Sequence, residues 1–193
     1  LLWPDLPTAA AQNNLRVTLS RLRELAANIG DSASAELLVT DRNSVQLHPT
    51  WIECCDVNQF NQLLAKTRLH QHVARNQCAG CQADLQTAVQ LYQAEFLTGL
   101  ALDDCPAFEE WLFIQRERLH LLALTACADL AGYAETNGDW SSARAFAQRQ
   151  IEIDPLREPA YRQLMRSLAA LGERNAALEA ADRLKSEFIA NVS

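Results

Sequence analysis

The chain has 193 residues, of which 49% are hydrophobic and 21% are charged, and its mean hydropathy is −0.15. This composition predicts a globular protein with one large domain or two small ones, and it excludes disorder as the main state. No stretch approaches the roughly 18 to 20 continuous apolar residues of a membrane-spanning helix, and the first residues lack the pattern of a signal peptide. We therefore expect a cytoplasmic protein that does not bind membranes.

Charge is distributed unevenly along the chain. Residues 1–68 carry 6 basic and 7 acidic side chains, whereas residues 69–193 carry 11 basic and 17 acidic ones. Because contacts with phosphates need a surplus of Lys and Arg, the acidic second part is a poor surface for nucleic acid. Any contact with DNA is therefore expected in the first part.

An amphipathic helix is predicted over residues 9–27. One face of this helix carries Leu15, Leu19, Leu22 and Ala26 at the 3.6-residue period. The residues that face away from this apolar side are Asn13, Arg16, Val17, Ser20 and Arg21. Such a polar face is typical of a solvated surface helix, and it also suits a helix that contacts a polar partner.

A β-hairpin is predicted directly after this helix. Its strands are Leu37–Thr40 and Val45–Leu47, and the polar residues Asp41-Arg42-Asn43-Ser44 form the turn. We expect Trp51–Cys55 to form a third short strand.

Two histidines and two cysteines lie close together in the next segment: His70, His72, Cys78 and Cys81. They supply the four nitrogen and sulfur ligands of a tetrahedral zinc site, and the two-residue gap between the cysteines lets one turn present both sulfurs. Four protein ligands leave no open position for a substrate, so the ion would be structural rather than part of a metalloenzyme. Two other interpretations stay open: a linker whose cysteines are buried at the start of the next helix, and a redox pair of cysteines. The other cysteines, Cys54, Cys55, Cys105 and Cys127, are expected in the core.

From about residue 83 onward, the sequence predicts helices separated by short turns. Helices are expected at 84–98 and 107–123, and residues 124–190 then repeat at a spacing of 34. The matched pairs are Leu130 with Leu164, Gly138 with Gly172, Ala143 with Ala177, and Ala147 with Ala181. This spacing is the tetratricopeptide period, in which small residues let antiparallel helices pack closely and a glycine lies in the turn. The expected core of this part includes Phe96, Phe108, Trp111, Leu119 and Tyr161.

Several motifs resemble those of one family of bacterial regulators. Residues 2–7 (LWPDLP) and 14–23 (NLRVTLSRLR) resemble the recognition-helix region of antibiotic-regulatory-protein (SARP) type transcription factors, and residues 38–47 resemble the wing that follows. Further along, five segments resemble the bacterial transcriptional activator domain (BTAD) of the same regulators: Asp56-Val57 with Phe60, and residues 91–97, 108–112, 116–119 and 154–158.

This resemblance implies a DNA-binding transcriptional regulator. In that family a winged helix binds promoter DNA, and the helical domain supports dimerisation and contacts with the transcription machinery. The resemblance places Asn13, Arg16, Ser20 and Arg21 toward base edges or phosphates, with Arg42 as the phosphate contact of the wing. In the family a small sheet and two helices precede the segment that resembles residues 2–7. We expect DNA binding to depend on those elements, because Leu15, Leu19 and Leu22 should pack against them.

The expected fold is therefore mainly α, with a partial winged helix followed by a tetratricopeptide-like antiparallel helical domain. The expected boundaries are 1–56 for the winged-helix part, 57–82 for a linker with the candidate metal site, and 83–193 for the helical domain. The expected partners are promoter DNA, RNA polymerase or another protein, and a second copy of the chain. The alternative is a tetratricopeptide-type scaffold that binds proteins and has no DNA binding of its own. No phosphate-binding glycine loop and no GxSxG or HExxH motif occurs, so no enzyme activity is expected.

Overall fold

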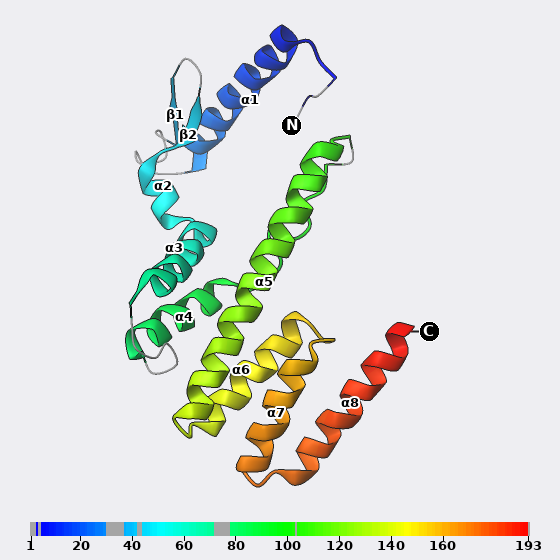
Figure 1. Ribbon diagram of the computed structural model, residues 1–193. Coiled ribbons are helices and arrows are strands. Elements are labelled where there is room, and N and C mark those ends of the chain that lie inside the picture. Colours follow the sequence, from blue (N-terminus) through cyan, green and yellow to red (C-terminus); the bar gives the residue numbers. More distant parts are fainter. Residues whose placement is uncertain are drawn as a thin grey trace. The chain divides into compact units, whose positions relative to one another are not determined.

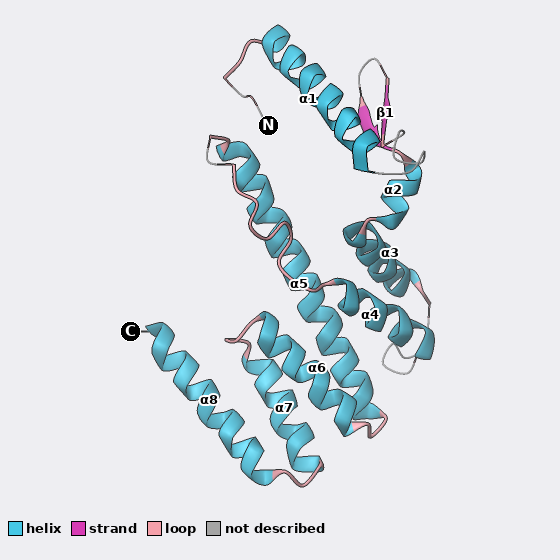
Figure 2. Cartoon of the chain, turned by 180° about the vertical axis from the view of Figure 1, so that it is seen from behind, coloured by secondary structure: helices cyan, strands magenta, loops and turns pink. Residues whose placement is uncertain are grey.

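The computed structural model describes residue 3 and residues 5–29, 37–41, 44–71, 78–102 and 104–192. Within these ranges the chain is mainly helical, with a two-stranded antiparallel sheet near its start (Figures 1 and 2). This confirms the mainly α fold class. Among the described residues, no helix is both long and apolar enough to span a membrane.

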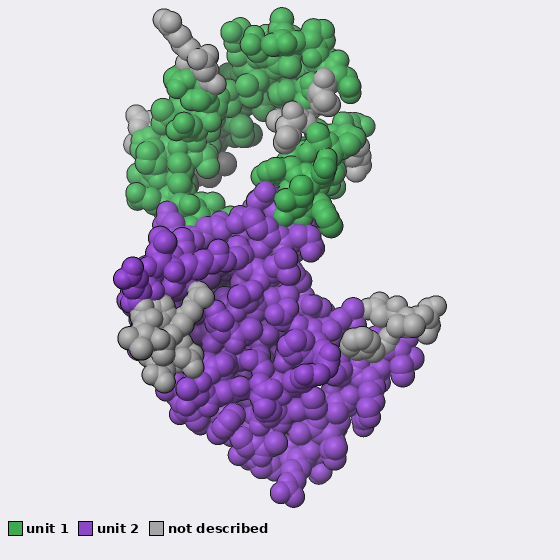
Figure 3. Space-filling model, viewed as in Figure 1, with its two compact units in different colours: residues 1–59, 99–114 green, residues 60–98, 115–193 purple. Residues whose placement is uncertain are grey.

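The chain divides into two compact units, which are coloured separately in Figure 3. The first unit comprises residues 1–59 and 99–114, and the second comprises residues 60–98 and 115–193. The long helix α5 (Pro106–Thr136) contributes its first residues to the first unit and the rest to the second. The domain boundaries at residues 56 and 82 follow sequence motifs rather than contacts, and they stay a prediction.

The first unit contains the predicted helix and hairpin. Helix α1 (Thr8–Ile29) precedes the strands β1 (Leu38–Thr40) and β2 (Val45–Leu47), which pair with Thr40 opposite Val45. Asp41 closes the hairpin, because its carboxylate accepts hydrogen bonds from the backbone N–H of Ser44 at 2.7 Å and from its hydroxyl at 2.8 Å. Arg23 of α1 donates a hydrogen bond to the Thr40 hydroxyl at 3.1 Å, so the helix and the hairpin are joined. Both predicted elements are confirmed.

The third strand predicted at Trp51–Cys55 is wrong, because a short helix, α2 (Pro49–Cys54), occupies this segment. Pro49 lies at the first helical position, where its fixed φ suits a helix and its missing N–H leaves no bond unmade. The backbone N–H of Trp51 donates to the carbonyl of His48 at 2.9 Å, which begins the turn. The proline before the apolar run was the signal for a helix.

Helices α3 (Asp56–Leu69) and α4 (Ala79–Leu91) are in contact within the second unit. Lys66 and Asp84 form an ion pair at 2.8 Å, and the rings of Phe60 and Tyr92 have their centroids 6.1 Å apart. Phe60 and Leu64 of α3 are buried, as are four residues of α4. Helices α3 and α4 therefore form a helical hairpin at the start of the helical part.

The helix expected at 84–98 begins earlier and ends at Leu91, so its predicted end is wrong. Leu97 has φ +51, a conformation that no helix continues. The carbonyls of Phe96 and Leu97 accept hydrogen bonds from the Arg116 guanidinium at 2.9 and 2.8 Å instead of bonds within a helix. A side chain distant in sequence therefore holds the chain path that follows this helix.

The 34-residue repeat is present as antiparallel helices. Helix α6 (Trp140–Ile153) packs on α7 (Glu158–Ala170), and α7 packs on α8 (Arg174–Val192). The turns before α6 and α8 use Gly138 at φ +74 and Gly172 at φ +83, a region in which other residues are strained. The helix expected at 107–123 continues without a break into the first helix of the repeat, since residues 107–136 contain no proline and only one glycine. The prediction of tetratricopeptide-like repeats is consistent with this arrangement.

The main core lies in the second unit. The largest fully buried side chains include Leu124 and Leu130 of α5, Gln150 of α6 and Tyr161 of α7. The core prediction is confirmed for Leu119 and Tyr161, whereas Phe96 and Phe108 are half-buried.

Trp111 is 37% exposed, and its core placement is therefore wrong. Cys105 and Cys127 are buried as expected, Cys55 is half-buried, and Cys54 is exposed. The prediction for Cys54 is wrong because α2 buries none of its residues.

Candidate functional site

The residues predicted to contact DNA lie on α1. Asn13, Ser20 and Arg21 are exposed, while Arg16 is exposed and also lines a cavity between α1 and the hairpin. This cavity has a volume of about 630 Å³, and Leu15, Arg23 and Thr40 are among the other residues that line it. Arg42 lies outside the described residues. Of the described candidates, Arg16 is therefore the one that the fold brings next to the hairpin.

Sequence reasoning missed Arg23 as part of this surface. Arg23 lies seven residues after Arg16 and so on the same side of the helix, where its guanidinium reaches Thr40. The seven-residue spacing of the two arginines was the signal that could have identified it.

The apolar side of α1 is open in the described part of the chain. Leu15 is 39% exposed, Leu22 is 41% exposed and Leu25 is 58% exposed. No described residue of α1 is buried. A run of exposed large apolar side chains on one helix is typical of an interaction surface.

Three of the four predicted metal ligands converge in the second unit. The Nδ1 atom of His70 lies 3.2 Å from the Sγ atom of Cys81 and 3.5 Å from that of Cys78. All three ligand atoms lie within 4.8 Å of one another. The fourth predicted ligand, His72, lies outside the described residues.

The ends of two helices position these side chains. Helix α3 ends at Leu69, so His70 is the first residue after the helix. Its backbone N–H still donates a hydrogen bond to the carbonyl of Lys66 at 3.0 Å. Cys78 is the N-cap of α4, and Cys81 lies within the first turn of that helix. His70 is exposed, Cys78 is half-buried and Cys81 is buried, so the cluster spans the surface and the interior.

The start of α4 favours the thiolate form of Cys78. A hydrogen bond with the backbone N–H of Cys81 lowers the pKa of the Cys78 thiol. The thiol lies at the start of α4, which is the positive end of the helix dipole. Two sulfurs and an imidazole nitrogen form a soft set of ligands, which suits zinc and excludes magnesium or calcium.

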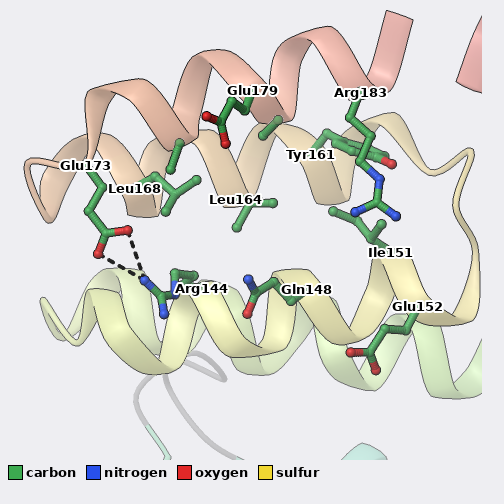
Figure 4. Close-up of a pocket in the computed structure, with 12 residues that line it drawn as sticks. Arg144, Gln148, Ile151, Glu152, Tyr161, Leu164, Leu168, Glu173, Glu179 and Arg183 are labelled. Atoms are coloured by element: carbon green, nitrogen blue, oxygen red, sulfur yellow. Dashed lines mark hydrogen bonds and ion pairs between the residues drawn. The ribbon is translucent and has the colours of Figure 1, made fainter. Parts of the chain in front are cut away.

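A second cavity lies among α6, α7 and α8 (Figure 4). It has a volume of about 600 Å³ and is lined by apolar residues such as Leu164 and by charged residues of both signs. Arg144 and Glu173 form an ion pair at 3.0 Å at its edge. Tyr161 forms part of its wall, and its hydroxyl is a buried polar atom without a hydrogen-bond partner among the described residues.

Comparison with known proteins assigns the helical part of the chain. The family model of the bacterial transcriptional activator domain matches residues 55–190, a range that runs from the start of α3 into α8. No curated protein and no solved structure shows a significant match. The matched family consists of transcription regulators and is not a family of enzymes, so the match implies a role in transcriptional activation. It also confirms the resemblance noted in the sequence for the segments that follow residue 55. The chain belongs to the bacterial transcriptional activator domain family.

Proposed function

We propose that this chain is a DNA-binding transcriptional activator of the bacterial cytoplasm. In this proposal α1 and the hairpin contact promoter DNA, and the helices of the family match carry the contacts with RNA polymerase and with a second copy of the chain. The family match over residues 55–190 is the observation that carries the proposal. The proposal includes no catalytic step.

The surface of α1 supports the DNA-binding part of the proposal. Arg16 and Arg21 are exposed, and a guanidinium group suits both guanine edges and phosphate oxygens. Asn13 and Ser20 add an amide and a hydroxyl to the polar side of the same helix, and an α-helix of this kind fits the major groove. The bond from Arg23 to Thr40 keeps the hairpin beside the helix.

The distribution of charge supports separate roles for the first part of the chain, which would bind DNA, and the helical part, which would bind proteins. Residues 69–193 carry 11 basic and 17 acidic side chains, so the helical part repels a phosphate backbone. Stacked helical pairs present broad surfaces for other proteins, and the cavity among α6, α7 and α8 lies on such a stack. We therefore assign protein contacts to this part.

A DNA-binding assay tests the proposal. Sites are first selected from random duplex DNA with the full-length protein, and Kd is then measured by fluorescence anisotropy across a range of salt concentrations. A base contact by Arg16 or Arg21 predicts that R16A or R21A weakens binding by about 1 to 3 kcal/mol at the selected site. A phosphate contact predicts instead that affinity falls by the same factor for all DNA sequences. The slope of log Kd against the logarithm of the salt concentration should then be smaller by about one unit.

Arg162 supplies the matched control for these variants. It is an exposed arginine of α7 that pairs with Glu158, and R162A should leave DNA binding unchanged. Weak binding that does not respond to salt, or equal losses in R162A and R16A, would contradict the assignment to α1. The activator role is tested on the same DNA with purified bacterial RNA polymerase, where added protein should raise transcript yield, and sedimentation should show a dimer.

A further inference from the structure

We propose that His70, Cys78 and Cys81 bind one Zn²⁺ ion that fastens the end of α3 to the start of α4. The ion would be structural. This inference goes beyond the proposed function and does not depend on DNA binding.

The distances within the cluster fit a tetrahedral zinc ion. Zinc lies about 2.3 Å from sulfur and about 2.0 to 2.1 Å from nitrogen, so tetrahedral angles place neighbouring ligand atoms about 3.5 to 3.8 Å apart. The Nδ1 atom of His70 lies 3.2 and 3.5 Å from the two sulfurs. Small rotations of these side chains are therefore enough to surround an ion.

A third donor separates this cluster from a simple pair of cysteines. A redox pair needs only Cys78 and Cys81, and a buried core cysteine needs no partner. Here an imidazole from the end of another helix is directed at both sulfurs. A metal site requires several soft donors that converge on one point, whereas a redox pair of cysteines requires no third donor.

The cluster joins the two helices of the hairpin at the end of α3 and the start of α4. Beside it, α3 and α4 are connected by the ion pair of Lys66 with Asp84, in which the lysine side chain is 68% exposed. An ion pair so open to water contributes little to stability. A zinc ion would close the chain from residue 70 to residue 81 and so stabilise the pairing of the two helices.

The position of the three ligands supports a structural role, because an ion bound by all three would join the end of α3 to the start of α4. The cluster contains three residues, and Asp84 of the same helix α4 is paired with Lys66.

The test uses the full-length protein, purified under reducing conditions, loaded with Zn²⁺ and dialysed. Elemental analysis should find one zinc per chain. The variants C78S and H70A should lose the metal, with Kd for Zn²⁺ raised more than about a hundredfold, because removing even an outer partner of a metal ligand costs about 10- to 100-fold. C54S and H48A are matched controls, since Cys54 is exposed and His48 pairs with Thr50, and both should keep one zinc.

Cobalt substitution provides a second readout that does not depend on the variants folding. The wild-type protein with Co²⁺ should show visible bands of a tetrahedral ion and a near-ultraviolet band from thiolate ligation. Adding a zinc chelator should lower the melting temperature of the wild type and leave that of C78S unchanged. The proposal is overturned if the reduced wild type retains no zinc, if cobalt shows no thiolate band, or if C54S loses zinc as C78S does.

Discussion

Two cysteines of the same chain occupy opposite environments. Cys127 on α5 is fully buried, and burial raises the pKa of its thiol to about 11. Cys54 on α2 is exposed. Because the thiolate is the reactive form, these two side chains should differ strongly in reactivity.

We expect iodoacetamide at pH 8 to label Cys54 and to leave Cys127 unmodified in the folded protein. With its pKa raised, Cys127 is a thiolate in only about one molecule in a thousand at this pH, and the reagent has no path to it. Mass spectrometry of peptides from the labelled protein gives the measurement. In denaturant both residues should react, and equal labelling of the two in the folded protein would show that the α5 core opens readily.

The side chain that sequence reasoning could least foresee is Gln150. It is fully buried, and its amide nitrogen donates to the Oε1 atom of Gln163 at 2.8 Å, while its Oε1 accepts from Arg157 at 3.4 Å. A glutamine is usually exposed, so its burial depends on partners that only the packing of α6 on α7 supplies.

At the scale of the element, α6 has a defined start. Asp139 is its N-cap, and its carboxylate accepts a hydrogen bond from the backbone N–H of Ser142 at 3.1 Å. Hydrogen bonding with Ser142 lowers the pKa of this carboxyl below its ordinary value of 3.8. An acceptor at this position satisfies an N–H that the first turn leaves without a helical partner.

We expect D139A to lower the free energy of unfolding by about 1 kcal/mol at pH 7. Since the pKa is lowered in the folded state, the charged carboxylate stabilises the fold above pH 3.8, and this contribution is lost as the pH falls through the folded value. The difference between D139A and the wild type in urea unfolding should therefore shrink in acid. D139N keeps an acceptor but also lacks the titrating carboxyl, so its smaller loss relative to the wild type should shrink in acid in the same way, and the gap between the two variants should stay constant with pH. An equal effect of both variants at every pH would contradict this account.

For the whole molecule, burial differs greatly between elements. No described residue of α1 is buried, whereas α6 buries four residues and α7 buries five. Elements with few buried contacts open at low free energy, and core elements open only when the fold is lost.

Hydrogen exchange of the intact protein should follow this contrast. Backbone amides of α6 and α7 should exchange more slowly than those of α1 by at least about tenfold. Mass spectrometry of peptic fragments gives the comparison within one sample, so each element serves as a reference for the other. Protection of α1 equal to that of α7 would show that the α1 surface is covered in solution. DNA added to the protein should increase protection at α1 and the hairpin and leave that of α6 and α7 unchanged.

Local sequence patterns were sufficient for the elements whose structure depends on neighbouring residues. The 3.6-residue period identified α1, the polar turn between apolar runs identified the hairpin, and Gly138 and Gly172 marked the repeat. The motifs after residue 55 also identified the family from the sequence, as the family match confirms. Pro49 could have corrected the strand predicted over α2, because the helix start that it favours is equally local.

Tertiary structure decided the features that depend on residues distant in sequence. Arg116 sets the chain path at Phe96 and Leu97, Trp111 stays exposed despite its apolar ring, and His70 meets Cys81 across the ends of two helices. The spacing of the histidines and cysteines predicted a cluster, but only the packing of α3 on α4 brings three of the ligand atoms within 4.8 Å of one another. The physical reason is that periodicity records which side of an element is apolar, whereas burial and ligand distances depend on what another element places against that side.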